Sequence, residues 1–240
     1  MRPGLFLALA LAILPAGCES AGDYGRVLGS IQTAAGGPVT AAEIDAGLRE
    51  ALTLGTNNVA GRLGRTDGYF GDPKVRIPLP NAYRNTQRQL ALIGASGPLD
   101  DLELRINRAA EAAMPEARTL VVSAIRQMTI EDAVRILNGG NTAATDFLRA
   151  RTEANLRAAF TPHVRDALAR SGAFSALESV AGQVGAGGAT AGLQADLTSH
   201  AVQFGLDGLF LYVAEEEKNI RENPVARTTD LLRRVFGGQR

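Results

Sequence analysis

The sequence predicts one compact all-α domain crossed by a single extended, proline-rich segment. Ala, Leu, Arg and Glu, which favour helices, are abundant in this chain of 240 residues. Apolar residues recur at helical spacing in at least six segments, whereas only one short stretch alternates apolar residues with others. No period of 20–50 residues repeats, which argues against a solenoid. We therefore expect a multi-helix domain over residues 40–237 and no regular strand.

The first helix is expected to begin after Thr40. Glu43 lies three residues further on, which is the spacing of a capping box. The turn-forming residues 67–73, rich in Gly and Asp, end this helix. Between these points an apolar stripe recurs at helical spacing: Ile44, Leu48, Leu52 and Val59.

An irregular segment, residues 67–80, follows and is called the strap below. Pro78 and Pro80 donate no backbone hydrogen bond, so a central strand is excluded here. Its apolar residues are expected to press onto the helices: Val75, Ile77 and Leu79. The strap either simply covers the core, or its exposed Tyr69 and Phe70, with Ile77 and Leu79, frame a groove for a partner.

Further helices are predicted along the rest of the chain. They cover residues 82–93, 98–114, 116–128, 130–137, 142–160, 162–171, 197–222 and 227–236. Thr129 with Asp132 resembles another N-terminal cap, at the start of the helix over 130–137. Pro115 is expected to end or kink one helix, and Pro162 to open another. The Gly/Ala-rich residues 182–192 are expected to form a loop. The helix over 197–222 is apolar almost all round in its middle, which is typical of a central helix.

The N-terminus has the layout of a secretory signal. Arg2 precedes an apolar run over residues 5–14, which is too short to span a bilayer, and small residues follow before Cys18. We expect residues 1–17 to be a signal peptide and residues 18–39 a flexible tether. Cys18, the single cysteine, is the expected lipid-attachment site, although Pro15 stands where the bacterial lipobox prefers Leu. The alternative is an ordinary cleavage site with a bystander thiol. The expected location is the periplasm, with a lipid anchor in a bacterial membrane.

Composition and motifs exclude several classes of function. The formal net charge is zero, so there is no electrostatic case for nucleic-acid binding. Two isolated histidines and one cysteine do not provide metal-ligand spacing, and no cofactor loop or nucleophile motif is present, so we expect no metal and no cofactor. The run Glu215 to Glu217 is interpreted as a solvated helix face, with Glu217 and Arg221 forming a weak surface pair.

Short strings along the chain resemble the bacterial domain of unknown function 4197 family over about residues 40–237. They are TDGYF at 66–70, IPLP at 77–80, NRAAE at 107–111, MT at 128–129, DA at 132–133, ILNG at 136–139, DGLF at 207–210, AEEE at 214–217 and PVARTTDLL at 224–232. The resemblance implies an exported helical protein of undetermined activity. It therefore implies no catalytic residues.

Asp207 is the most informative single position. Its neighbours are apolar on every face of the predicted helix, and a buried unpaired carboxylate is costly, so a partner is expected. Arg108 or Arg227 could provide a bidentate guanidinium. The pair would either lock the packing of helices or place a polar group at the base of a ligand pocket.

These observations favour a non-enzymatic envelope protein. Its expected partner is another envelope protein or a small apolar ligand. The alternative is a hydrolase-like enzyme that uses Asp207, Glu111 and an arginine without a recognisable motif. A cleft that gathers acids and a hydroxyl would favour the enzyme, whereas an exposed apolar patch would favour binding.

Overall fold

The computed structural model describes residues 38–183 and 190–237, which contain eight α-helices and no strand. The helices are α2 (Ala41–Leu63), α3 (Asn81–Ala91), α4 (Gly97–Arg126), α5 (Ile130–Leu137), α6 (Ala143–Arg170), α7 (Ala173–Gln183), α8 (Thr190–Glu222) and α9 (Asp230–Gly237), with a short 3-10 helix η2 (Pro224–Ala226). The predicted all-α class is confirmed, whereas the helix α7 was not predicted. The expected signal peptide, Cys18 and nearly all of the expected tether lie outside these residues. Val39, which the sequence assigns to the tether, is buried in the core.

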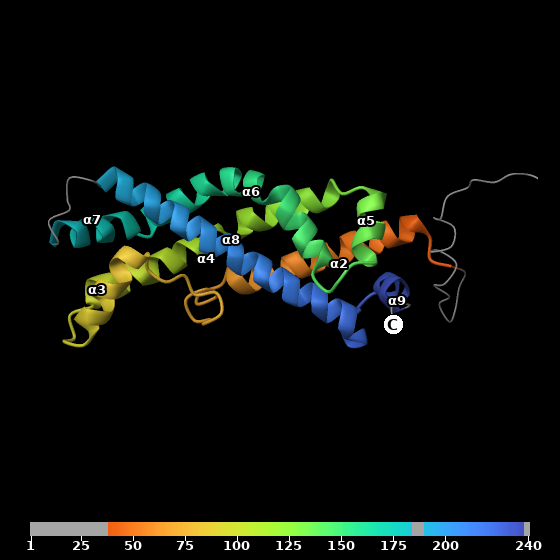
Figure 1. Ribbon diagram of the computed structural model, residues 1–240, viewed down its shortest axis with the longest axis horizontal. Helices are drawn as coiled ribbons and strands as arrows, with labels where there is room; N and C mark the ends of the chain where they lie inside the picture. The colour runs from red at the N-terminus through yellow and green to blue at the C-terminus, as the bar shows by residue number, and fades with distance from the viewer. Residues whose placement is uncertain (1–37, 184–189, 238–240) are drawn as a thin grey trace, which may run out of the picture.

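The four long helices α2, α4, α6 and α8 lie alongside one another in an elongated bundle (Figure 1). The helices α3 and α7 lie at one end of it, and α5, α9 and the start of α2 lie at the other. One continuous apolar core runs from Val39 to Phe236 and contains buried residues of all of these helices except α3, which packs on it only through partly buried side chains. No helix among the described residues is long and apolar enough to cross a membrane.

The helix starts that sequence predicts from capping boxes are confirmed. Thr40 accepts a hydrogen bond from the Glu43 amide and Glu43 accepts one from the Thr40 amide, and Thr129 and Asp132 make the same reciprocal pair. These motifs satisfy backbone donors within four residues, so they form without help from distant parts of the chain.

Pro115 does not end its helix, and the prediction that Pro162 opens a new helix is wrong. Pro115 lies inside α4 and Pro162 lies inside α6, and both helices are continuous. A proline removes only one hydrogen bond from the ladder. Buried residues lie on both sides of each proline, so both halves of each helix pack into the same core: Met114 and Ala117 in α4, Phe160 and Val164 in α6.

The last long helix begins earlier than predicted and is not buried all round. It starts at Thr190, so the end of the expected Gly/Ala-rich loop is helical, while residues 184–189 lie outside the described residues. Phe204 and Leu211 are 37% and 41% exposed. One face of α8 is therefore open to solvent in the middle of the bundle.

Candidate functional site

The strap is fixed to α4 by two side chains that bond to its backbone. Asn107, which is completely buried, donates to the carbonyl oxygen of Ile77 (2.8 Å) and accepts from the Ile77 amide (2.9 Å). Glu111 accepts from the amides of Tyr69 (3.1 Å) and Phe70 (3.2 Å). Because these are buried backbone groups of an irregular segment, the two side chains take the place of a regular hydrogen-bond ladder.

Arg108 and Glu111, both predicted as site residues, are brought together here. Arg108 donates to Glu111 (2.7 Å) and to Asp67 (2.8 Å). The hydrogen bond to Glu111, with the charges of both acids, raises the pKa of Arg108. This arrangement stabilises the turn at the start of the strap.

Tyr69 is buried, and the prediction that it is exposed is wrong. Its hydroxyl donates to the carbonyl oxygen of Gly205 on α8 (2.6 Å), and burial raises its pKa. Gly208 makes this approach possible, because a Cβ atom there would lie 2.9 Å from the ring of Tyr69 and 3.1 Å from Cβ of Val75. Ile77 and Leu79 are also buried, so of the four strap residues predicted to frame a groove only Phe70 is partly exposed.

The other edge of the strap is held by polar contacts with α2 and α8. Asp72 accepts from the hydroxyl of Tyr212 and from Arg62. Burial alone would raise the pKa of Asp72, but these hydrogen bonds and one from the Lys74 amide outweigh it, so the pKa lies below its usual value. Burial and the bond to Asp72 raise the pKa of Tyr212 to about 12.

His200 on α8 holds the strap near its end. Its Nε2 donates to the carbonyl oxygen of Pro78 (2.7 Å). Burial lowers the pKa of His200, the hydrogen bond to Pro78 acts in the opposite direction, and the charge of Arg84 lowers it further.

We expect this histidine to make stability depend on pH below about 6.5, the ordinary pKa of a histidine in an unfolded chain. Because its folded-state pKa is lowered, its contribution is complete above its unfolded pKa and is lost as the pH falls toward the folded value. For one proton the slope is at most about 1.4 kcal/mol per pH unit. Urea denaturation should show that His200→Gln reduces the slope, whereas His163→Gln, at an exposed position, does not. Equal slopes in all three proteins would contradict this role.

A groove of about 510 Å³ lies between the strap, the start of α6 and α8. Its apolar wall is formed mainly by Phe204, Phe210 and Leu211, with Val75 from the strap. Its charged residues are Lys74, Arg76, Asp146, Arg149 and Asp207. Phe204, Asp207 and Leu211 recur at helical spacing, so they share the open face of α8.

Asp207 lines this groove and is half-exposed, so the prediction that it is buried is wrong. It accepts from Arg149 (2.8 Å) and from Gln203 (2.7 Å), and the Arg149 guanidinium lies over the ring of Phe210. Its partner is therefore neither Arg108 nor Arg227. The physical reason is that the strap covers the glycine face of α8, whereas Asp207 lies on the open face beside it.

Arg227 has a different role from the one expected. It is buried, and it donates to the carbonyl oxygens of Ile220 (3.0 Å) and Arg221 (2.7 Å) in the last turn of α8. These carbonyl groups have no partner within the helix, so Arg227 terminates α8.

Because the Asp207–Arg149 pair is half-exposed, we expect Asp207→Ala to lower the free energy of unfolding by no more than about 1 kcal/mol. Chemical denaturation of the variant checks this, with Asp146→Ala, another carboxylate of the groove, as the matched control. A loss above about 3 kcal/mol would mean that the pair is buried in solution.

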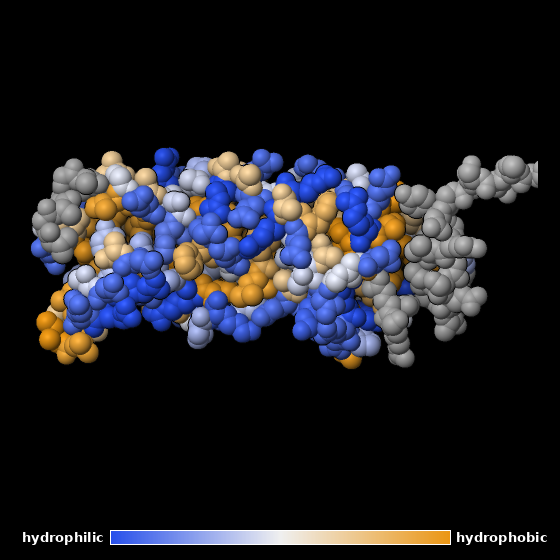
Figure 2. Space-filling view, in the orientation of Figure 1, coloured by the Kyte–Doolittle hydropathy of each residue, from blue (hydrophilic) through white to orange (hydrophobic). Residues whose placement is uncertain are grey.

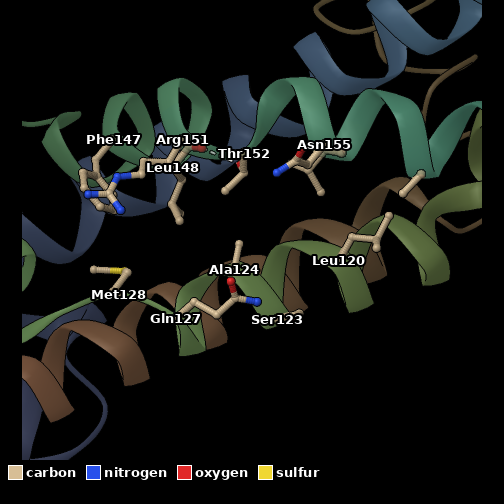
Figure 3. Close-up of a pocket in the computed structure, with 12 residues that line it drawn as sticks. Leu120, Ser123, Ala124, Gln127, Met128, Phe147, Leu148, Arg151, Thr152 and Asn155 are labelled. Atoms are coloured by element: carbon tan, nitrogen blue, oxygen red, sulfur yellow. Dashed lines mark hydrogen bonds between the residues drawn. The ribbon is translucent and has the colours of Figure 1, made fainter.

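A second pocket, of about 370 Å³, lies between the C-terminal half of α4 and the first half of α6 (Figure 3). Arg151, Phe147 and Met128 lie at one end of it, and Leu120 at the other. The guanidinium of Arg151 lies over the ring of Phe147 (5.2 Å). None of the predicted site residues lines this pocket.

One family model, described as "Protein of unknown function (DUF4197)", matches residues 38–237 of the chain. The chain belongs to this family. No curated protein and no solved structure shows significant similarity to it. The resemblance identified from the sequence strings is therefore confirmed.

The fold explains why two of those strings lie where they do in the DUF4197 domain. Residues 66–70 and 207–210 are far apart in sequence, but Tyr69 of the first packs against Gly208 of the second. The string at 107–111 supplies Asn107, which fixes the strap. Together, three strings of the family build the junction of the strap, α4 and α8.

Sequence reasoning missed several residues of this site. Asn107 and Gly208 lay in strings that had been singled out, but nothing in their spacing indicated a contact with the strap. Nothing in the sequence distinguishes Arg149 as the partner of Asp207, because it is one of many arginines on predicted helices. Among the described residues, no group of three or more His, Cys, Asp or Glu could hold a metal ion.

Proposed function

We propose that the DUF4197 domain of this chain is an exported, lipid-anchored binding module that holds an apolar segment of another protein in the groove between the strap and α8. The observation that carries the proposal is that Phe204 and Leu211, although exposed, lie in the middle of a long helix and line a groove. The other exposed large apolar residues lie at helix ends or in the connections between helices: Leu92, Ile93, Ile130 and Val225. An apolar stripe on a helix is a common docking surface for peptide segments.

The form of the groove favours a protein segment over a small molecule. Its volume is within the range of ligand pockets, but it is an open trough between three elements. A small ligand is usually enclosed over most of its surface, whereas a helix or extended segment leaves one side in solvent.

The charges of the groove indicate the chemistry of the segment. Lys74 and Arg76 lie on the strap wall, both substantially exposed, and pair with Glu215 and Glu103 at the surface. Surface pairs of this kind are weak, so a carboxylate of a bound segment can compete for the two cations. Asp207 and Arg149 neutralise each other on the opposite wall. A segment whose large apolar residues are followed on one side by Asp or Glu would match this arrangement.

The enzyme alternative has less support. It needs Asp207 and Glu111 in one cleft, but the two acids share no hydrogen-bond partner among the described residues. Glu111 is buried and occupied by two strap amides and Arg108.

A displayed library of random peptides, selected against the protein, tests the groove. The expected peptides contain large apolar residues with adjacent carboxylates. Leu211→Asp should weaken their binding by about tenfold or more, because it buries an unpaired charge against the peptide. Val225→Asp, at an exposed position outside the groove, is the control. Peptides that bind Leu211→Asp as well as the unmodified protein would refute the proposal.

Export and anchoring rest on residues 1–18 and have a separate test. Fractionation and intact-mass measurement should find a processed, lipid-carrying form in the membrane fraction. Cys18→Ser should release the protein in soluble form. Full-length protein in the cytoplasm would exclude export, and a Cys18→Ser variant that stays with the membrane would exclude the lipid anchor.

A further inference from the structure

A second exposed apolar feature lies at one end of the bundle, where α3 turns into α4. Leu92 and Ile93 are 87% and 77% exposed. Figure 2 shows an apolar cluster projecting at the end of the molecule where Figure 1 draws the turn from α3 into α4. These two residues, with Arg84 and Arg88, are called the α3 tip below.

The backbone holds the two aliphatic residues outward. Gly94 has a positive φ of 70°, which glycine adopts without strain, and it reverses the chain directly after Ile93. No residue of α3 is buried, and only Tyr83 and Leu90 among its apolar side chains pack on the core. The α3 tip therefore protrudes from the bundle instead of belonging to its core.

The α3 tip also carries two arginines, and within residues 38–183 and 190–237 neither of them forms an ion pair with an acid. Arg84, Arg88 and Leu92 are four residues apart, so they share one helix face. The guanidinium groups of Arg84 and Arg88 donate hydrogen bonds to the amide oxygens of Asn81 and Asn85, respectively. Residues 81–99 contain no Asp or Glu. The first acid after them, Asp100, is engaged by Ser96 and Gln87.

We propose that the α3 tip inserts into the interface of a bilayer that contains anionic lipids. The side chains of the α3 tip suit both regions of such an interface. The aliphatic side chains enter the acyl boundary, while the arginines reach headgroup phosphates. A protein partner fits less well. Two side chains on a convex point cannot bury the area that a stable protein interface needs, whereas shallow insertion requires only that they protrude.

This contact is separate from the proposed anchor and from the groove. The start of α2, where the chain arrives from its N-terminus, lies at the opposite end of the bundle (Figure 1). The inference therefore holds whether or not Cys18 carries lipid.

Tryptophan fluorescence tests the inference directly, because the chain contains no Trp. The test uses residues 18–240 with Cys18→Ser, since the whole apolar core lies within residues 39–236. In this background Leu92→Trp should show a blue shift with vesicles of phosphatidylcholine and phosphatidylglycerol, and brominated lipids should quench it. Val225→Trp, equally exposed but on η2, should show neither effect.

Two further double variants and one control distinguish the contribution of apolar insertion to vesicle binding from that of charge. Leu92→Asp with Ile93→Asp should lower vesicle partitioning by about tenfold or more. Arg84→Glu with Arg88→Glu should lower it by a similar factor on anionic vesicles. Arg65→Glu with Arg126→Glu, at exposed positions elsewhere, changes the net charge equally and should have a smaller effect.

An unchanged emission of Leu92→Trp with anionic vesicles would overturn the inference and leave the α3 tip to a protein partner. Equal losses of vesicle binding in the Arg84/Arg88 and the Arg65/Arg126 double variants would also overturn the inference, because binding would then depend only on net charge.

Discussion

Glu217→Ala is expected to lower the free energy of unfolding by about 3–5 kcal/mol, because it leaves a buried guanidinium without its partner. Glu217 and Arg221 side chains are only 4% and 6% exposed. Glu217 accepts from the amides of Ala144 and Thr145 at the start of α6, and from Arg221. Arg221 in turn donates to carbonyl oxygens at the end of α5.

Glu217 thus does the work of an N-cap for a helix 72 residues away in the sequence. Thr142, the residue before α6, makes no side-chain cap hydrogen bond. Removal of the carboxylate therefore leaves amides of the first turn without an acceptor in addition to the unpaired arginine.

The control for this prediction comes from the same run of acids. Glu215 is exposed and pairs with Lys74 on the surface, so Glu215→Ala should cost less than about 1 kcal/mol. Chemical denaturation of both variants makes the comparison. Similar losses of unfolding free energy in the two variants would contradict the buried network. They would mean that all three acids, Glu215 to Glu217, lie on a solvated helix face.

Tyr69→Ala is expected to cost about 3–5 kcal/mol, the range for removal of a buried aromatic side chain. The ring fills the space beside Gly208, and its hydroxyl bonds to Gly205. Tyr69→Phe, which removes only that hydrogen bond, should cost about 1 kcal/mol. Phe70→Ala is the matched control: Phe70 is partly exposed against Arg76, so its loss should be clearly smaller.

A double-mutant cycle locates the effect at the junction of strap and helix. Gly208→Ala alone places a methyl group against the ring and should destabilise by about 1–3 kcal/mol. In the Tyr69→Ala background the same methyl group enters the vacated space, so its cost should fall. Strictly additive losses would mean that the two residues do not touch.

The elements that sequence predicted correctly are those fixed by neighbouring residues. Thr40 with Glu43, and Thr129 with Asp132, specify helix starts within one turn. The alternation of Val75, Ile77 and Leu79 likewise placed the inward face of the strap correctly. Local spacing in the sequence is therefore enough to predict both the helix starts and the buried face of the strap.

The errors arose where a distant part of the chain decides the outcome. Tyr69 lies in a turn-forming string, and only the glycine face of α8 explains why it is buried. Asp207 looked buried because its neighbours include Gly205 and Gly208, whose apolar character reflects the packing of the strap on one face. Glu217 looked like a surface acid, because the start of α6 that it caps is remote in sequence. No periodicity within one helix reports such contacts.

The central claim is that the groove between the strap and α8 binds an apolar segment. Amide and methyl chemical-shift mapping by nuclear magnetic resonance, with a peptide selected from the library, tests it most directly. If the groove binds the peptide, we expect chemical-shift changes concentrated at residues 74–76, 146–149 and 204–211. Changes concentrated instead at the pocket between α4 and α6, around Leu120 and Phe147, would contradict it.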